Sequence, residues 1–330
     1  MIKAGIAGLG WWGQNLVRAV QGKGTPISFT AGAVRHPDKV AEFASAQGLT
    51  LFDSLDAMLD AADIDAVVLA TPHSIHAEQI VAAAAAGKHV FCEKPFTMNR
   101  ADAERAVAAA TDAGVQIAVG YNRRFHPAMI ELRNRLAAGA LGTPLHVEAM
   151  AAIPAGLWLG PDDWRFNRVE WPAGGIAPMG VHQIDHMVEL FGPIASVYCH
   201  AVRRVVAADI DDTTAVLIEF ANGMTGFLST LLAARADNRF AVYGSAGNAE
   251  IRPRSYNHLE FTPLEGEAEI IDFGDYDMDT ETLKAQLVAF ADAVEGRAPF
   301  PVSPDQIVHV VAVTDAIIRS AETRKPVQVA

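Results

Sequence analysis

The chain has little cysteine, no long apolar run and fewer basic than acidic residues. Its two cysteines, Cys92 and Cys199, lie far apart, so the sequence contains neither a disulfide framework nor a zinc motif. Because no stretch of about 18 uncharged apolar residues occurs, we expect no membrane-spanning helix. The net charge of −13 disfavours binding to nucleic acid or anionic membranes. We therefore expect a cytoplasmic protein with neither kind of partner.

What is present is an ordinary globular composition, with 51% hydrophobic and 20% charged residues in a chain of 330, enough for about two domains. The first 120 residues alternate short apolar runs with helical patterns. The predicted strands are 2–7, 27–34, 66–70, 89–92 and 116–119. Continuous apolar strands separated by helices indicate a parallel, doubly wound sheet.

The pattern changes after about Arg123, where longer alternating runs begin. Asn222-Gly223 and the loop 244–247 each separate two such runs, which is a hairpin signal. Helices are expected at 127–138, 181–190, 281–294 and 304–321. The sequence thus predicts an α/β protein with two domains. Residues 1–122 form a Rossmann domain, and residues 123–330 form a C-terminal α/β domain with a large, mostly antiparallel open sheet.

A glycine motif, Gly8-Leu9-Gly10-Trp11-Trp12-Gly13, joins the first predicted strand to the first helix. In this context Gly8 permits a tight turn, Gly10 lets the backbone approach a pyrophosphate, and Gly13 allows close packing of helix on strand. Phosphates would meet the amides at the helix N-terminus. The alternative is a glycine-rich turn without a ligand.

The end of the second predicted strand bears on the choice of cofactor. An NAD site usually places Asp or Glu there to hold the ribose hydroxyls, but this position is Val34. Arg35 and His36 follow, with Lys39 one turn later. Basic groups suit a 2′-phosphate, so we expect NADP(H), with NAD as the alternative if these side chains only face solvent.

Two later strands end in polar turns, at Thr71-Pro72 and at Glu93-Lys94-Pro95. In an open α/β sheet such turns lie at the carboxyl edge, where ligands bind. Lys94 would hydrogen-bond the oxygen that interconverts between alcohol and ketone. The alternative is a solvent lysine stiffened by the proline.

His182, Asp185 and His186 are spaced to share one face of a helix, which resembles a pocket wall. A metal site is a rival interpretation, but no further ligand is evident and we expect none. A structural histidine is the other alternative. An aromatic stretch precedes this helix and favours stacking on a sugar or cyclitol ring, although core packing explains some of its members. It consists of Trp158, Trp164, Arg165, Phe166, Arg168 and Trp171.

Together these motifs resemble the Gfo/Idh/MocA family of oxidoreductases, over essentially the whole chain. The resemblance rests on residues 8–13, Thr71-Pro72 with His76, 87–90 running into 93–95, 120–125, Trp164-Arg165, and Gly180-Val181-His182 with Asp185. It implies that Lys94 is the catalytic lysine, that His182 gives or takes the proton, and that Asp185 lines the substrate pocket. It also implies a homodimer or homotetramer formed through the C-terminal sheet.

The expected site residues follow from the motifs and the resemblance. The catalytic set is Lys94, His182 and Asp185. The cofactor set is Gly8, Gly10, Trp11, Trp12, Gly13, Arg35, His36, Thr71, Pro72, His76, Glu93, Lys94, Asn122 and Arg124. The substrate set is Tyr121, Trp164, Arg165, His182, Asp185 and His186.

One position departs from the family pattern, because many active members carry an Asp four residues before the histidine and this chain has Pro178. Orientation of His182 must therefore come from elsewhere. The expected function is hydride transfer between NADP(H) and a secondary alcohol or ketone of a sugar, cyclitol or related cyclic diol. The alternatives are a glycoside hydrolase that retains NAD and a silent dinucleotide-binding sensor.

Overall fold

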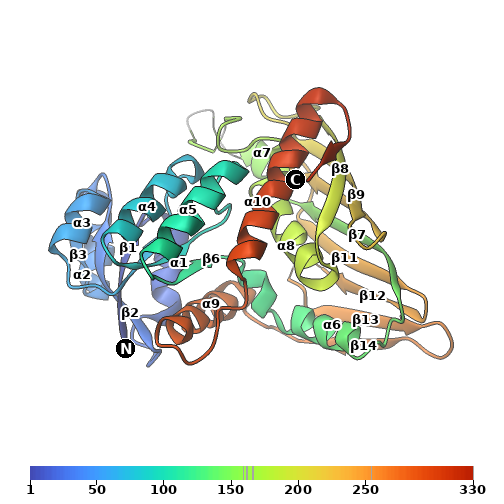
Figure 1. Ribbon diagram of the computed structural model, residues 1–330, viewed down its shortest axis with the longest axis horizontal. Coiled ribbons are helices and arrows are strands. Elements are labelled where there is room, and N and C mark those ends of the chain that lie inside the picture. Colours follow the sequence, from blue (N-terminus) through green and yellow to red (C-terminus); the bar gives the residue numbers. More distant parts are fainter. Residues whose placement is uncertain (159, 161–162, 166, 254, 330) are drawn as a thin grey trace. The chain divides into compact units, whose positions relative to one another are not determined.

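The computed structural model describes residues 1–158, 160, 163–165, 167–253 and 255–329 (Figure 1). The chain divides into two compact units. Unit 1 comprises Met1–Asn122 with Asp277–Val308, and unit 2 comprises Arg123–Tyr276 with His309–Ala330. The expected division placed all of 123–330 in one domain, whereas residues 277–308 group with the first unit.

Unit 1 contains a six-stranded parallel sheet in the order β3-β2-β1-β4-β5-β6. Its strands are β1 (Ile2–Ala7), β2 (Ile27–Ala33), β3 (Thr50–Phe52), β4 (Ala66–Leu69), β5 (His89–Cys92) and β6 (Ile117–Val119). Its helices include α1 (Trp11–Val20), α2 (Ala41–Gln47), α3 (Leu55–Ala61), α4 (His76–Ala85) and α5 (Arg100–Asp112). This confirms the doubly wound parallel sheet. Because strand order reverses between β1 and β4, ligands are expected at the carboxyl ends of these strands.

Helix α9 (Met278–Val294) belongs to unit 1 although it lies far along the chain. Leu283, Leu287 and Phe290 are fully buried in the same core cluster as residues of β1, β2 and α1. The Phe290 ring meets the Phe91 ring of β5 edge-on, at 5.7 Å between centroids. Burial of this apolar face explains why 277–308 joins the first unit rather than the second.

Unit 2 contains a nine-stranded sheet in the order β14-β13-β12-β11-β7-β10-β9-β8-β15. Every pairing is antiparallel except that of β10 with β7, which confirms a large, mostly antiparallel sheet. Its strands are β7 (Pro144–Ala152), β8 (Ile194–Val202), β9 (Thr213–Phe220), β10 (Thr225–Leu231), β11 (Asp237–Gly244), β12 (Gly247–Arg252), β13 (His258–Pro263), β14 (Glu269–Asp272) and β15 (Val327–Gln328).

The helices of unit 2 include α6 (Pro127–Ala137), α7 (Ala155–Trp158) and α8 (Gly180–Phe191), and α10 (Pro304–Thr323) runs across the boundary of the two units. Figure 1 shows α6 and α8 on the same side of the sheet. Strand β9 alternates buried and exposed side chains, with Val216 and Ile218 buried and Leu217 exposed between them. One face of the sheet is therefore covered, while the other is accessible in this chain.

Local signals explain where several helices begin. Ser54 caps α3 by accepting a hydrogen bond from the Ala57 amide, and Asn99 caps α5 by accepting one from Asp102. Helix α3 and the three-residue strand β3 before it were not predicted from the sequence. The described helices include none that is long and apolar enough to cross a membrane.

Candidate active site

The glycine turn of unit 1 is built for close backbone packing. Gly8 has φ +93°, and a Cβ at this position would lie 2.4 Å from the Ala70 carbonyl oxygen. A Cβ on Gly13 would lie 1.9 Å from the Gly8 carbonyl oxygen. At both positions only glycine fits, because the backbone conformation or the neighbouring backbone excludes a side chain.

Gly10 differs from its two neighbours in the motif, because it has ordinary backbone angles and no atom lies within 4 Å of its added Cβ. It is the N-cap of α1, and the helix carries no side-chain cap. The amides of the first turn of α1 are therefore not engaged by a capping side chain. Open space beside such a helix end fits the pyrophosphate of a dinucleotide.

The structure places Arg35 and His36 directly after β2, with exposed side chains. Val34, at the usual position of the ribose-binding carboxylate, is half-buried. Trp11 is 66% exposed at the start of α1, whereas Trp12 packs against the core of the unit. The segment after β2 thus presents basic side chains, and the turn after β1 presents one exposed aromatic ring.

The turns after β4 and β5 are tied together by His76. Its ring is buried, with Nδ1 2.9 Å from the Pro95 carbonyl oxygen and Nε2 3.1 Å from that of Thr71. Thr71 in turn contacts Gln79 through its hydroxyl, at 2.5 Å. His76 therefore connects the two strand-end turns, and its predicted place in the cofactor site stays a prediction.

Glu93 and Lys94 follow β5, and the peptide bond between Lys94 and Pro95 is cis. Lys94 is half-buried, and its amide donates a hydrogen bond of 3.3 Å to the Glu93 carboxylate. The Glu93 side chain is buried, and burial raises its pKa to about 7. Trp12 and Lys94 counteract part of this rise.

The residues after β6 are less accessible than the sequence led us to expect. Tyr121 and Asn122 are both buried, and the Asn122 amide donates a hydrogen bond of 2.7 Å to the Thr282 hydroxyl of α9. Asn122 therefore fastens the end of β6 to α9. The sequence did not predict that α9 would contact this segment. The signal that could have revealed it is a pair of polar residues, Thr282 and Gln286, within an otherwise apolar helix face.

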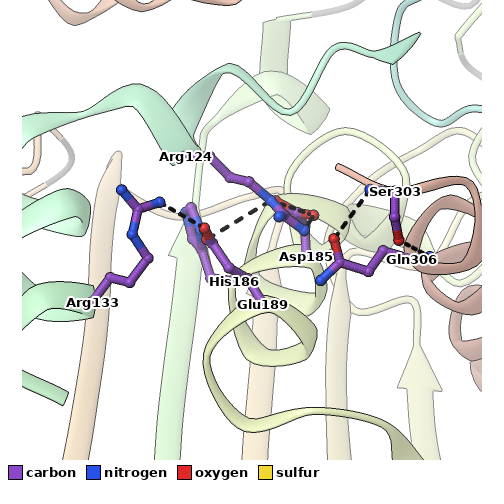
Figure 2. Close-up of polar contacts among 7 residues, drawn as sticks. All are labelled: Arg124, Arg133, Asp185, His186, Glu189, Ser303 and Gln306. Atoms are coloured by element: carbon purple, nitrogen blue, oxygen red, sulfur yellow. Dashed lines mark hydrogen bonds and ion pairs between the residues drawn. The ribbon is translucent and has the colours of Figure 1, made fainter. Parts of the chain in front are cut away.

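The largest difference from expectation concerns Asp185 on α8. Its carboxylate is fully buried and receives three hydrogen bonds from Arg124, two from Nε and one from Nη2, at 2.6–3.0 Å (Figure 2). Burial raises the pKa of Asp185, and the Arg124 guanidinium opposes that rise. Both side chains are buried within unit 2 and are paired with each other, and their predicted roles toward substrate and cofactor stay predictions.

His186 is also buried, one turn from His182 on the same helix. Its ring meets the rings of Phe240 and Tyr256 edge-on, and its Nδ1 lies 4.0 Å from the Glu189 carboxylate. Although burial acts to raise the pKa of Glu189, His186 and the nearby arginines lower it overall. The substrate-binding role predicted for His186 stays a prediction.

His182 is 5% exposed, and the neighbouring residues of α8 from Gly180 to Val188 are buried as well. Residues 180–188 of α8 are thus all buried, and the pocket-wall role predicted for its polar face stays a prediction. Among the described residues, no group of three or more His, Cys, Asp or Glu side chains is placed to hold a metal ion.

The aromatic stretch before α8 divides into surface and core. Trp164 is 37% exposed, and the Arg165 guanidinium lies 4.4 Å from its ring centroid while pairing with Asp163 at 3.2 Å. Trp171 instead belongs to a core cluster, as the plainer interpretation has it. Three further members complete the stretch: Trp158 is exposed, Arg168 pairs with Asp211 at 2.9 Å, and Phe166 lies outside the described residues.

Comparison with known proteins agrees with this geometry. Residues 2–121 match the family profile described as "Oxidoreductase family, NAD-binding Rossmann fold", and residues 129–250 match "GFO/IDH/MocA C-terminal domain". An inositol 2-dehydrogenase of Rhizobium meliloti (strain 1021) is 27% identical over 100% of this chain and 99% of its own length. A 1,5-anhydro-D-fructose reductase of Ensifer adhaerens is 26% identical over 96% of this chain and 94% of its own.

Solved structures share the same fold. A levoglucosan dehydrogenase in complex with NADH has a TM-score of 0.89, is 23% identical, and aligns over 100% of this chain and 99% of its own. The WlbA dehydrogenase of Bordetella pertussis, in complex with NADH and UDP-GlcNAcA, has a TM-score of 0.88 at 23% identity over 99% of this chain and 97% of its own. From the two matched domains, we conclude that the chain belongs to the Gfo/Idh/MocA family of oxidoreductases.

Proposed function

We propose that this enzyme transfers hydride between NADP(H) and a secondary alcohol or ketone of a sugar, cyclitol or related cyclic diol. The observation that carries the proposal is the open glycine turn at Gly10, on the same sheet edge as Lys94, which follows the end of β5. When bound there, a nicotinamide dinucleotide supplies or accepts the hydride.

The residues of this chain have separate tasks in the proposed reaction. The Lys94 side chain would donate a hydrogen bond to the substrate oxygen and so stabilise the charge that develops on it. His182 would hold or accept the proton of that oxygen. The side chain of Pro178 carries no acceptor such as the carboxylate found there in many active members, and both oxygens of Asp185 accept hydrogen bonds from Arg124.

The ring-shaped substrate class is supported by the relatives and by the surface aromatic group. Inositol 2-dehydrogenase, 1,5-anhydro-D-fructose reductase and trans-1,2-dihydrobenzene-1,2-diol dehydrogenase are names of relatives 26–28% identical to this chain. Trp164 with Arg165 stacked on it offers an exposed flat face, which suits a ring that carries hydroxyl groups.

Gly10 tests the cofactor site most cleanly. Alanine there meets no atom within 4 Å and keeps ordinary backbone angles, so Gly10→Ala should fold like the wild type. The added methyl would occupy the space assigned to the pyrophosphate. We expect its Kd for NADPH to rise about tenfold or more, because a misfit there removes charge-assisted hydrogen bonds. Equal binding by the variant would remove the glycine turn from the cofactor site.

Preference for NADP(H) rests on Arg35 and His36, which are exposed after β2, and on Val34 at the usual position of the ribose-binding carboxylate. The double change Arg35→Ala with His36→Ala should weaken NADPH binding roughly tenfold and leave NADH binding within about twofold. Lys23→Ala serves as the control for a general loss of positive charge. If the wild type prefers NADH, the basic residues only face solvent and NAD is the cofactor.

Lys94→Ala tests the chemical step in a screen of sugars and cyclitols. We expect turnover to fall by about 10²–10⁴-fold while the Kd for NADPH changes little, since the lysine acts on the substrate oxygen. Lys88→Ala, at the opposite end of β5, is the matched control and should turn over normally. Undiminished turnover in Lys94→Ala would refute the assigned role.

Pro178 is the observation that keeps a silent sensor as a second candidate. A sensor binds NADPH but shows no turnover with any polyol, and neither lysine variant changes that. Release of free sugar from a glycoside, with a cofactor that does not dissociate, would instead identify the hydrolase.

We also propose a homodimer or homotetramer formed through the accessible face of the nine-stranded sheet. Tyr198, Leu217 and Phe227 are register partners in one row across β8, β9 and β10, and Leu217 is 58% exposed. Leu217→Glu should yield monomers in light scattering, because it would bury a charge in the interface.

Both cysteines are buried free thiols, which suits work in the reducing cytoplasm.

A further inference from the structure

The Glu93 carboxylate of unit 1 is buried, and it lies next to the backbone amide of the proposed catalytic lysine. Its residue is 4% exposed, and a Cβ on Gly120 would lie only 2.7 Å from its Oε1. The Lys94 amide donates to its Oε2 at 3.3 Å. The side chains of Trp12 in α1 and Gln286 in α9 face the carboxylate and lower its pKa. Neither makes a hydrogen bond of ordinary geometry to it. Glu93 is thus a buried carboxylate with few hydrogen-bond donors around it.

In these surroundings the neighbouring groups determine whether Glu93 is charged. Burial raises the pKa to about 7, and the largest opposing influences are the Trp12 indole and the positive charge of Lys94. A carboxylate in these surroundings is present in both charge states near neutral pH. No guanidinium is recorded against it among the described residues, unlike Asp185.

The charged and titratable groups recorded around Glu93 are Lys94 and Cys92. Burial keeps the pKa of the Cys92 thiol well above its usual value, and Glu93 raises it further, so the thiol stays neutral. The other elements packed against the carboxylate contribute neutral groups, namely Trp12, Gln286 and the backbone of Gly120. The charge of Glu93 is therefore coupled mainly to that of Lys94.

We propose that Glu93 is a positioning residue that sets the charge of Lys94. As an anion it holds the neighbouring side chain in the ammonium form, and as a neutral acid it allows the amine to lose its proton more readily. This inference rests on the proposed function, because it matters to the reaction only if Lys94 contacts the reacting oxygen. In the direction of ketone reduction, ionised Glu93 extends the pH range in which Lys94 is a cationic donor.

The test measures the Lys94 amine itself and needs no turnover. Wild type and Glu93→Gln are labelled briefly with acetic anhydride between pH 6 and 10, and mass spectrometry quantifies the acetylated Lys94 peptide. Removing a buried opposite charge should move the midpoint of Lys94 labelling down by about one pH unit or more. Near pH 8 the variant should then be labelled roughly tenfold faster. Lys88 and Lys284 serve as controls within the same samples and should not change.

A second variant covers the case in which Glu93→Gln does not fold, which circular dichroism will reveal. Trp12→Phe removes the indole N–H and should make Glu93 neutral over a wider pH range, so Lys94 labelling moves the same way by a smaller amount. A residue with only a structural role would leave the midpoint unchanged in a folded variant, and that result would overturn the inference.

The two proposals fail in different ways. If the labelling midpoint moves but no substrate is turned over, Glu93 controls Lys94 and the assigned reaction is wrong. If turnover depends on Lys94 but the midpoint stays in place, the reaction stands and the role of Glu93 is refuted. Where both hold, the alkaline limb of the pH profile for ketone reduction should move down in Glu93→Gln by the same amount as the labelling midpoint.

Discussion

The glycine turn of unit 1 and helix α8 of unit 2 carry the residues expected to act together, but they are built in opposite ways. The glycine turn is defined by backbone conformation within a few residues, at Gly8, Gly10 and Gly13. Helix α8 is defined by side-chain contacts between distant segments, above all the Arg124–Asp185 pair. The first kind of site follows from a local motif, whereas the second depends on which partners the fold brings together.

The two buried carboxylates sharpen this contrast. Asp185 has a guanidinium that gives it three hydrogen bonds and a full opposite charge. Glu93 has an amide at 3.3 Å, an indole and an amide side chain nearby, and the charge of Lys94. A strongly paired charge is suited to holding a core together, while a weakly paired one is suited to changing its charge.

The largest expected effect comes from breaking the pair in α8. Arg124→Met leaves the Asp185 charge buried without its partner and should lower the free energy of unfolding by about 3–5 kcal/mol. Urea unfolding followed by circular dichroism measures this. Arg133→Met is the matched control, because Arg133 pairs with Glu189 at 3.0 Å but is 42% exposed. This variant should lower the free energy of unfolding much less. A loss in Arg124→Met no larger than in the control would mean that the Arg124–Asp185 pair does not hold the core of unit 2 together.

Gly8→Ala is the corresponding break in unit 1. The alanine would adopt φ +93° and approach the Ala70 carbonyl, so we expect a loss of roughly 3 kcal/mol from strain and overlap together. Gly22→Ala separates the two causes, because Gly22 has φ +69° but open space around it. It should cost about 1–2 kcal/mol by thermal or urea unfolding. Equal losses in both variants would mean that the contact with Ala70 is unimportant.

Glu93 should make unit 1 less stable as the pH rises. Its pKa is raised from 4.5 to about 7, so its favourable contribution is complete below pH 4.5 and is lost as the pH passes 7. The free energy of unfolding of Glu93→Gln, taken relative to that of the wild type, should therefore rise by roughly 3 kcal/mol between pH 5 and pH 8. Unfolding curves at several pH values test this, and a pH-independent difference would mean that Glu93 does not titrate there.

His126 should give unit 2 the opposite response. It caps α6 by accepting a hydrogen bond from Ala128, and burial lowers its pKa to about 4, with His186 contributing. Because the folded pKa lies below the unfolded value of 6.5, the contribution is complete above pH 6.5 and is lost on acidification. His126→Asn retains a capping group that does not titrate in this range. Between pH 6.5 and 5 the variant should therefore lose about 2 kcal/mol less of its free energy of unfolding than the wild type. An unchanged acid response in the variant would assign the sensitivity to other groups.

The sequence was a good guide wherever a signal is local. The periodicity of the apolar runs predicted the parallel sheet, and Asn222-Gly223 predicted the hairpin between β9 and β10. The short β3 and α3 were missed because their apolar pattern covers too few residues. Helix α9 was expected, but its membership of unit 1 was not, since nothing near Phe290 reveals that its ring meets Phe91.

The site was predictable to a smaller degree for the same reason. Spacing alone placed Asp185 and His186 on one face of a helix with His182, but it could not indicate that Arg124, 61 residues earlier, would enclose the carboxylate. The burial of Glu93 between α1, β6 and α9 likewise depends on three separate segments. Long-range partners decide whether a polar residue acts in the core or at a surface.

The most direct test of the account is a fluorescence titration of cofactor-stripped protein with NADPH and NADH, run side by side on the wild type and Gly10→Ala. We expect saturable binding by the wild type with NADPH preferred, and at least about tenfold weaker binding by a variant of unchanged thermal stability. Failure of the wild type to bind either nucleotide would contradict the proposed hydride transfer, whatever the fold.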